Sequence, residues 1–147
     1  MYKRMITLTD GPIVYIDDDE DDQFLFEQTL KTLGLTNEVR PFFDGQEALY
    51  YLENTTERPL LILCDLNMPL MNGLELRQSI DSNVHLKQMA IPFVFYTTAA
   101  GPNQVRKAYE ETIQGFHAKA QELSEYRAQI SLIINYWKSC LHPDSFE

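Results

Sequence analysis

The stretch IVYIDDDEDD, residues 13–22, places six consecutive acidic residues directly after four largely apolar ones. A short continuous apolar run is typical of a strand that is buried on both faces, as the strands of a parallel sheet are. In sheets of this kind, ligands bind beyond the carboxyl ends of the strands. The stretch therefore predicts a buried parallel strand over 13–16 whose carboxyl end carries a concentrated negative charge.

Four more segments have the character of strands. The runs LLILC (60–64) and FVFY (93–96) are continuous and apolar, GFHA (115–118) is weaker, and Pro41 marks EVRPFF (38–43) as an edge strand. Apolar residues at helical spacing occupy the intervals and the C-terminal part, over 26–33, 46–53, 74–80, 103–112 and 123–141. Five alternating strand–helix units predict an α/β fold with a parallel sheet and helices on both faces.

Composition restricts the possible partners and the cellular compartment. The 147 residues suit one domain, and 22 acidic against 12 basic side chains give a formal net charge of −10. Binding to nucleic acid needs clustered cations, which are lacking here, so we expect no nucleic-acid partner. No apolar run approaches the ~20 residues of a membrane span, and the N-terminus lacks the apolar segment of a signal peptide. Two cysteines, Cys64 and Cys140, suggest no disulfide framework, and we expect a cytoplasmic protein without a membrane partner.

Polar side chains follow four of the predicted strands. In chain order these are Asp17 with Asp18, Asp65, Thr97 and Lys119. Neighbouring carboxylates repel one another, and a hard divalent cation such as Mg²⁺ relieves that repulsion. A carboxylate beside such a metal can attack phosphorus and form an acyl phosphate, and a lysine can pair with the phosphoryl oxygens. The pattern predicts Mg²⁺-dependent phosphoryl chemistry at one edge of the sheet.

Four motifs in order resemble the receiver domains of two-component response regulators. Among them, the segment Asp65 to Gly73 is the most specific. The motifs are IVYIDDDE (13–20), LLILCDLNMPLMNG (60–73), IPFVFYTTA (91–99) and AYEETIQGFHAKA (108–120). The resemblance implies a doubly wound, flavodoxin-like sheet of five strands in the order 2-1-3-4-5. It covers a core of about 12–141, so that 1–147 is expected to be a single receiver domain without an output domain.

The resemblance also implies roles for individual residues. Asp65 would accept a phosphoryl group from a histidine kinase or a phosphotransfer protein. Mg²⁺ would be held directly by Asp18, by Asp65 and by the backbone carbonyl of Asn67, while Asp17 would act mainly through water. Asn67 and Ala99 would flank the approach of the water that hydrolyses the acyl phosphate.

Three further positions match the family's switch. Thr97, preferred over Thr98 from the alignment of the preceding strand, would be the switch hydroxyl, and Lys119 would pair with the phosphoryl group. Phe116 would be the aromatic residue that moves inward. The resulting change would remodel the face formed by the helix after the fourth strand, the fifth strand and the last helix. Through that face the domain, which is not expected to be an enzyme, would contact a separate effector or a second copy of itself.

The remaining acids of the opening stretch have two interpretations. Asp19 matches a third acidic position that usually does not coordinate metal. Glu20, Asp21 and Asp22 fall at a helix start, where carboxylates are favoured by the helix dipole and by free N–H groups. This explanation is favoured over the alternative, in which the three acids raise the local field for Mg²⁺ or contact the kinase.

Two other functions stay open, and one of them follows from a departure from the family. Receivers usually have Lys-Pro with a cis peptide after the fifth strand, whereas this chain has Lys119-Ala120. Because a cis bond without proline costs ~2.5–4 kcal/mol, we expect a trans peptide, or else a strained cis peptide. A degenerate receiver that acts as a phosphorylation-independent binding module is one alternative. A phosphatase resembling the haloacid dehalogenases is the other, because Asp17-Asp18-Asp19 contains a D-x-D, and its nucleophile would be Asp17.

Overall fold

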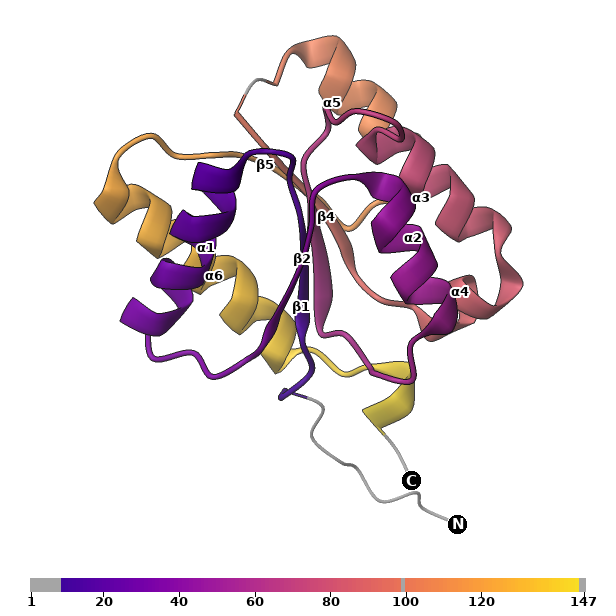
Figure 1. Ribbon diagram of the computed structural model, residues 1–147, viewed down its shortest axis with the longest axis horizontal. Coiled ribbons are helices and arrows are strands. Elements are labelled where there is room, and N and C mark those ends of the chain that lie inside the picture. The colour runs from indigo at the N-terminus through magenta and orange to yellow at the C-terminus, as the bar shows by residue number, and fades with distance from the viewer. Residues whose placement is uncertain (1–8, 99, 146–147) are drawn as a thin grey trace.

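The protein is described from a computed structural model that covers residues 9–98 and 100–145. Five strands form one parallel sheet in the order β2-β1-β3-β4-β5 (Figure 1). The strands are β1 (Ile13–Ile16), β2 (Val39–Phe42), β3 (Leu61–Cys64), β4 (Phe93–Thr97) and β5 (Gly115–Ala118). This arrangement confirms the predicted fold and strand order. It also confirms that the strand containing Pro41 lies at an edge, where a residue without an N–H is tolerated.

Helices cover both faces of the sheet. In Figure 1, α1 and α6 lie on one side, and α2 to α5 lie on the other. The helices are α1 (Glu20–Thr32), α2 (Gly45–Asn54), α3 (Gly73–Ser82), α4 (Val84–Met89), α5 (Pro102–Tyr109) and α6 (Leu123–Ser139). The output face expected from the sequence is therefore formed by α5, β5 and α6. Among the helices within the described residues, none has the length and apolar character needed to cross a membrane.

The central strand β1 supplies side chains to two separate cores. Val14 and Ile16 are buried on the side of α2 to α5, whereas Ile13 and Tyr15 are buried on the side of α1 and α6. All four β1 side chains are at most 1% exposed. Burial on both faces explains why the run is continuously apolar rather than alternating.

The loop that follows β3 is held close to the sheet by Gly73, the first residue of α3. A Cβ atom at this position would lie 2.6 Å from the Asp65 carbonyl oxygen and 2.5 Å from the Phe95 ring. Only glycine allows the backbone to approach so closely. The same helix is capped by Asn72 and Glu75, each of which accepts a hydrogen bond from the other's backbone N–H. The fold thus fixes both ends of the loop after Asp65.

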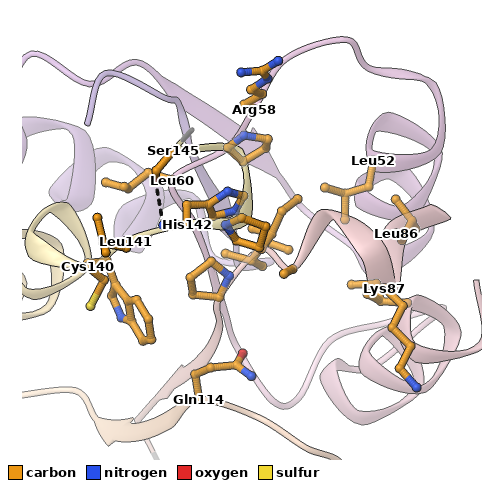
Figure 2. A pocket seen from close by; sticks show the side chains of 18 of the residues that line it. Leu52, Arg58, Leu60, Leu86, Lys87, Gln114, Cys140, Leu141, His142 and Ser145 are labelled. Atoms are coloured by element: carbon orange, nitrogen blue, oxygen red, sulfur yellow. Dashed lines mark hydrogen bonds between the residues drawn. The ribbon is translucent and has the colours of Figure 1, made fainter. Parts of the chain in front are cut away.

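The structure differs from the sequence-based prediction in three places. The short helix α4 was not predicted. Leu123 and Leu141 are 47% and 67% exposed, so the buried stripe of α6 is shorter than predicted. No element was predicted after residue 141, whereas Pro143–Ser145 forms a 3₁₀ turn in which Ser145 is buried. This tail lies beside a cavity of about 630 Å³, where Ser145 Oγ accepts a hydrogen bond from the His142 N–H (Figure 2).

Candidate functional site

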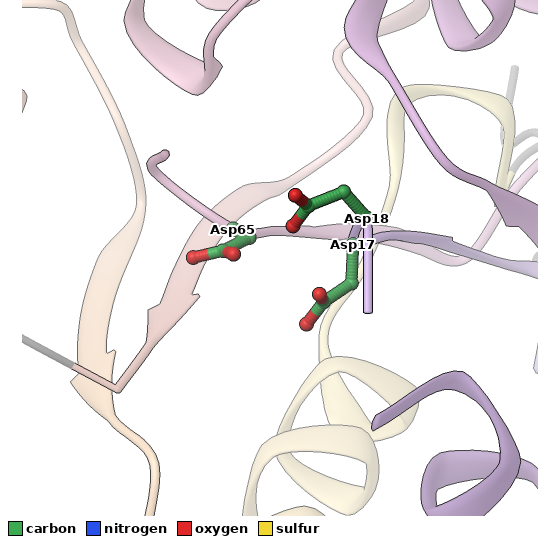
Figure 3. Close-up of side chains that lie close together, drawn as sticks. All are labelled: Asp17, Asp18 and Asp65. Carbon is green, nitrogen blue, oxygen red and sulfur yellow. The ribbon is translucent and has the colours of Figure 1, made fainter. Parts of the chain in front are cut away.

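Three carboxylates meet where β1 and β3 end. Asp17 and Asp18 follow β1, Asp65 follows β3, and one oxygen of each lies within 4.8 Å of the others (Figure 3). Asp17 is 1% exposed, Asp18 is exposed, and Asp65 is half-buried. The pairing of β1 with β3, from Ile13 opposite Leu61 to Ile16 opposite Cys64, brings the three side chains together. The Asp17-Asp18 pair therefore lies beside Asp65 at the edge of the sheet where the sequence predicted a metal site.

Lys119, which follows β5, reaches into the same site. Its ammonium group donates a hydrogen bond to Asp17 and a second one, of 3.0 Å, to Asp22 at the start of α1. It also lies 5.7 Å from the centre of the Tyr96 ring, within the range of a cation–π contact. The Lys119 side chain is only 6% exposed. Its charge is therefore balanced by two carboxylates from the N-terminal part of the chain.

The contact with Lys119 gives Asp22 a role that differs from those of its acidic neighbours. Neither of the two interpretations of Glu20, Asp21 and Asp22 included an ion pair with Lys119. Asp19 caps α1 by accepting hydrogen bonds from the N–H groups of Asp21 and Asp22. Glu20 and Asp21 are exposed in the first turn, in agreement with the helix-start explanation for these two.

Burial and mutual repulsion change the acidity of the site. Burial raises the pKa of Asp17 above its ordinary value and Asp65 adds to this effect, whereas hydrogen bonds from Lys119 and from the Asp19 amide oppose it. Burial also raises the pKa of Asp65, while a hydrogen bond from Thr97 and the charge of Lys119 act to lower it. A cation bound beside Asp17 and Asp65, in addition to Lys119, would reduce the repulsion that remains between these two carboxylates.

The other predicted site residues occupy distinct positions around Asp65. Thr97 is buried at the end of β4, whereas its neighbour Thr98 is exposed. Asn67 is exposed in the loop after β3, and its carbonyl remains a predicted metal ligand. Phe116 is half-buried on β5, with its ring centre 5.8 Å from that of Phe95. Ala99 lies outside the described residues.

The peptide bond between Lys119 and Ala120 is trans, because the described residues contain no cis peptide bond. The prediction of a trans bond is therefore confirmed. The cavity at the opposite edge of the sheet, near the amino ends of the strands, is lined by none of the predicted site residues. The carboxylate cluster of Asp17, Asp18 and Asp65 is thus spatially separate from that cavity.

Comparison with known proteins identifies the family. The sequence profile described as the response regulator receiver domain matches residues 13–131. The chain belongs to this family. The receiver assignment explains why acidic, hydroxyl and ammonium groups gather at one edge of the sheet, and the comparisons do not favour the haloacid-dehalogenase alternative.

The receiver has relatives along most of its length. It is 31% identical over 130 residues to response regulator Rcp1 of Synechocystis sp., an alignment that covers 85% of this chain and 87% of Rcp1. The structure of the phosphorylated cyanobacterial phytochrome response regulator RcpA superimposes with a TM-score of 0.82 at 28% identity, and covers 91% of this chain and 99% of that one. The Mn²⁺-bound form of Rcp1 superimposes with a TM-score of 0.79 at 29% identity, and covers 90% and 99%.

Proposed function

We propose that Asp65 accepts a phosphoryl group from a phosphohistidine of a kinase or a phosphotransfer protein. An Asp65 carboxylate oxygen attacks phosphorus, the P–N bond to the imidazole breaks, and the electron pair of that bond returns to the ring nitrogen. The product is an acyl phosphate on Asp65 and a free histidine on the donor. The observation that carries this proposal is the meeting of Asp65, two further carboxylates and a buried lysine within a receiver fold.

The donor set at this edge fits Mg²⁺. Three carboxylates lie within 4.8 Å of one another, and the two that are not exposed have pKa values raised by burial. Asp18, Asp65 and the Asn67 carbonyl would hold the ion, with Asp17 acting mainly through water, and the bound ion would neutralise charge on the phosphoryl oxygens. The structure of the related Rcp1 is an Mn²⁺-bound form, which supports the proposal that this receiver binds a divalent cation.

Lys119 and Thr97 would stabilise the phosphorylated form. The Lys119 ammonium group, held by Asp17 and Asp22 in the present structure, can turn toward a phosphoryl oxygen on Asp65 because lysine is a point charge on a flexible stem. The buried Thr97 hydroxyl, which interacts with Asp65, would donate to another phosphoryl oxygen. Movement of Thr97 toward the phosphoryl group would leave space that Phe116 could enter from β5.

The switch would be transmitted through the face formed by α5, β5 and α6. Four large apolar side chains on its two helices are exposed, namely Tyr109 (54%), Leu123 (47%), Leu132 (67%) and Tyr136 (57%). Exposed aromatic side chains are enriched in protein–protein interfaces. We propose a protein partner for this face, either an effector or a second copy of the chain, and neither nucleic acid nor a membrane.

In this proposal the chain is a phosphoacceptor rather than an enzyme that turns over a separate substrate. Phosphorylation is a local change of charge that shifts a two-state element, here the pair Thr97 and Phe116. The remaining alternative is a binding module that ignores phosphorylation. It predicts equal partner affinity with and without a phosphoryl group on Asp65.

Intact mass spectrometry tests the proposal. The protein is incubated with phosphoramidate in the presence and absence of Mg²⁺, with Asp65→Asn as the matched variant. We expect a gain of one phosphoryl group that requires Mg²⁺ and is absent from the variant. Labelling of Asp65→Asn to the same extent as the wild type would refute the assignment of Asp65.

A further inference from the structure

One side chain of α6, Gln129, holds the backbone on both sides of Lys119. Its Nε2 donates to the Ala118 carbonyl at 2.8 Å, and its Oε1 accepts from the Ala120 N–H at 3.1 Å. The same Oε1 accepts a 2.6 Å hydrogen bond from the Tyr96 hydroxyl of β4. The donors and acceptors around the amide group determine its orientation, because reversal would place the Gln129 NH₂ group against the Ala120 N–H and the Gln129 oxygen against the Ala118 carbonyl oxygen.

The contacts of Gln129 lie directly after the C-terminal end of β5 at Ala118. Lys119 N–H donates to the Thr97 carbonyl at 2.8 Å, directly after the final paired position of the two strands, Thr97 opposite Ala118. Beyond this point the Ala120 N–H points to Gln129 rather than to a strand. A proline at position 120 would have no N–H to donate, so the contact depends on the alanine. Gln129 therefore holds the backbone in place beyond the end of β5, on both sides of Lys119.

Tyr96 connects this backbone anchor to the lysine side chain. It is 1% exposed, so its hydroxyl and ring are held firmly by the core. The hydroxyl binds Gln129, and the ring centre lies 5.7 Å from the Lys119 ammonium nitrogen. One rigid residue thus contacts both the group that fixes the Lys119 backbone and the ammonium group itself.

We propose that Gln129 is a positioning residue for Lys119, an inference that rests on the proposed phosphoacceptor function. The Lys119 side chain starts from its Cα atom, so a displaced backbone at this position shifts the ammonium group relative to the phosphoryl oxygens. Errors of about 1 Å in the placement of reacting groups can cost up to roughly 10²-fold in rate. Gln129 limits this error by anchoring Ala118 and Ala120.

The test compares Gln129→Leu with Asn135→Leu. Asn135 is an exposed residue of the same helix, and its side chain donates a hydrogen bond to the Ser131 hydroxyl of that helix rather than to the Lys119 segment. With phosphoramidate and Mg²⁺, we expect phosphorylation of Gln129→Leu to be about tenfold slower and that of Asn135→Leu to be unchanged. Mg²⁺ affinity should be unaffected in both variants, because neither residue belongs to the carboxylate cluster.

A Lys119→Met background separates positioning from a general structural effect. If Gln129 acts through Lys119, adding Gln129→Leu to Lys119→Met slows phosphorylation no further, and the two effects are strongly coupled. Equal slowing by Gln129→Leu in both backgrounds, or no slowing in the wild-type background, would overturn the inference.

Hydrogen exchange of the Ala120 amide provides a readout that does not depend on phosphorylation. We expect this amide to be protected in the wild type and to exchange faster in Gln129→Leu, because Gln129 is its acceptor. Unprotected exchange in the wild type overturns the inference. If the wild type shows protection but accepts no phosphoryl group, the anchor stands and the proposed function fails.

Discussion

Two buried cations of this protein, Lys119 and Arg77, are bound in opposite ways. Lys119 lies at the carboxyl edge of the sheet and is held by carboxylates, those of Asp17 and Asp22. Arg77 of α3 lies nearer the other edge, forms an ion pair of 3.1 Å with Asp81 and donates to the backbone carbonyls of Glu111 and Thr112. Their side chains are 6% and 9% exposed.

The kind of acceptor distinguishes the two cations: we expect Lys119 to be able to change partners, whereas Arg77 cannot. The Arg77 guanidinium group lies over the Phe93 ring at 5.4 Å and donates to fixed carbonyls, and its planar shape suits several fixed acceptors at once. Within the described residues, the hydrogen-bond acceptors of the Lys119 ammonium group are two side-chain carboxylates rather than backbone carbonyls. Burial acts to lower the pKa of both cations. It prevails at Arg77, whereas the bonds to Asp17 and Asp22 raise the pKa of Lys119.

The largest effect is expected for Lys119→Met. Loss of the charge that faces the phosphoryl oxygens should slow phosphorylation by roughly 10²-fold, measured by intact mass over time. In metal-free buffer the variant should also lose about 3 kcal/mol of unfolding free energy in urea, because Asp17 remains buried without its cation. A phosphorylation rate within twofold of the wild type would remove the distinction between the two cations.

Arg77→Met should affect stability and leave the chemistry intact. The variant removes the donors to two carbonyls and one partner of Asp81, so we expect urea unfolding to show a loss of about 2 kcal/mol. Arg77→Lys should recover only a small part, because an ammonium group cannot reproduce the planar fork. Phosphorylation should stay within twofold of the wild type. A fall as large as that of Lys119→Met would show that Arg77 also serves the site.

Asp22→Asn should give a smaller change in the opposite direction. Asp22 is 31% exposed and competes for the Lys119 ammonium group, and a partly exposed pair of this kind is worth up to ~1 kcal/mol. Neutralising it should free Lys119 and accelerate phosphorylation by about twofold to fivefold. Asp21→Asn is the matched control, since Asp21 is exposed and does not contact Lys119 in the described residues. Slower phosphorylation of Asp22→Asn alone would indicate that Asp22 positions the lysine instead.

The smallest effect is expected at a cation on the surface. Arg40 of β2 binds Glu57 through two hydrogen bonds, of 2.9 and 2.6 Å, and their side chains are 29% and 35% exposed. Arg40→Met should therefore cost less than about 1 kcal/mol, well below Arg77→Met. A loss equal to that of Arg77→Met would mean that burial does not distinguish the two arginines.

The Arg40 pair also has a defined pH dependence. Hydrogen bonds from Arg40 and Tyr51 lower the pKa of Glu57 from 4.5 to about 2. Because the folded-state pKa is depressed, this stabilisation is fully present above pH 4.5 and is lost as the pH falls toward about 2. The difference in unfolding free energy between wild type and Glu57→Gln should shrink over this interval. A constant difference would contradict the assigned pKa.

The features that the sequence predicted well are local patterns. Continuous apolar runs reveal strands buried on both faces, and the side chain that follows each run lies at a known edge of the sheet. The helix α4 was missed because six residues, with Leu86 alone buried, are too few to show helical spacing.

The missed contacts join residues that are distant in the chain. Asp22 and Lys119 are separated by 97 positions, and the helix dipole already explained an acid at the start of α1. The contacts of Arg77 and Gln129 could not be predicted either, because an arginine or glutamine on a helix is usually a solvated side chain. Their partners are backbone groups of another segment, which carry no signal in the sequence.

Chemical mapping of the phosphorylated residue tests the central claim most directly. Borohydride reduces an acyl phosphate to an alcohol, so treatment of the phosphorylated protein converts the acceptor aspartate to homoserine, which peptide mass spectrometry locates. We expect the conversion at position 65 only, and only after incubation with Mg²⁺ and phosphoramidate. Conversion at position 17 or 18, or a retained phosphoryl group that resists borohydride, would contradict the assignment of Asp65 as the phosphoacceptor.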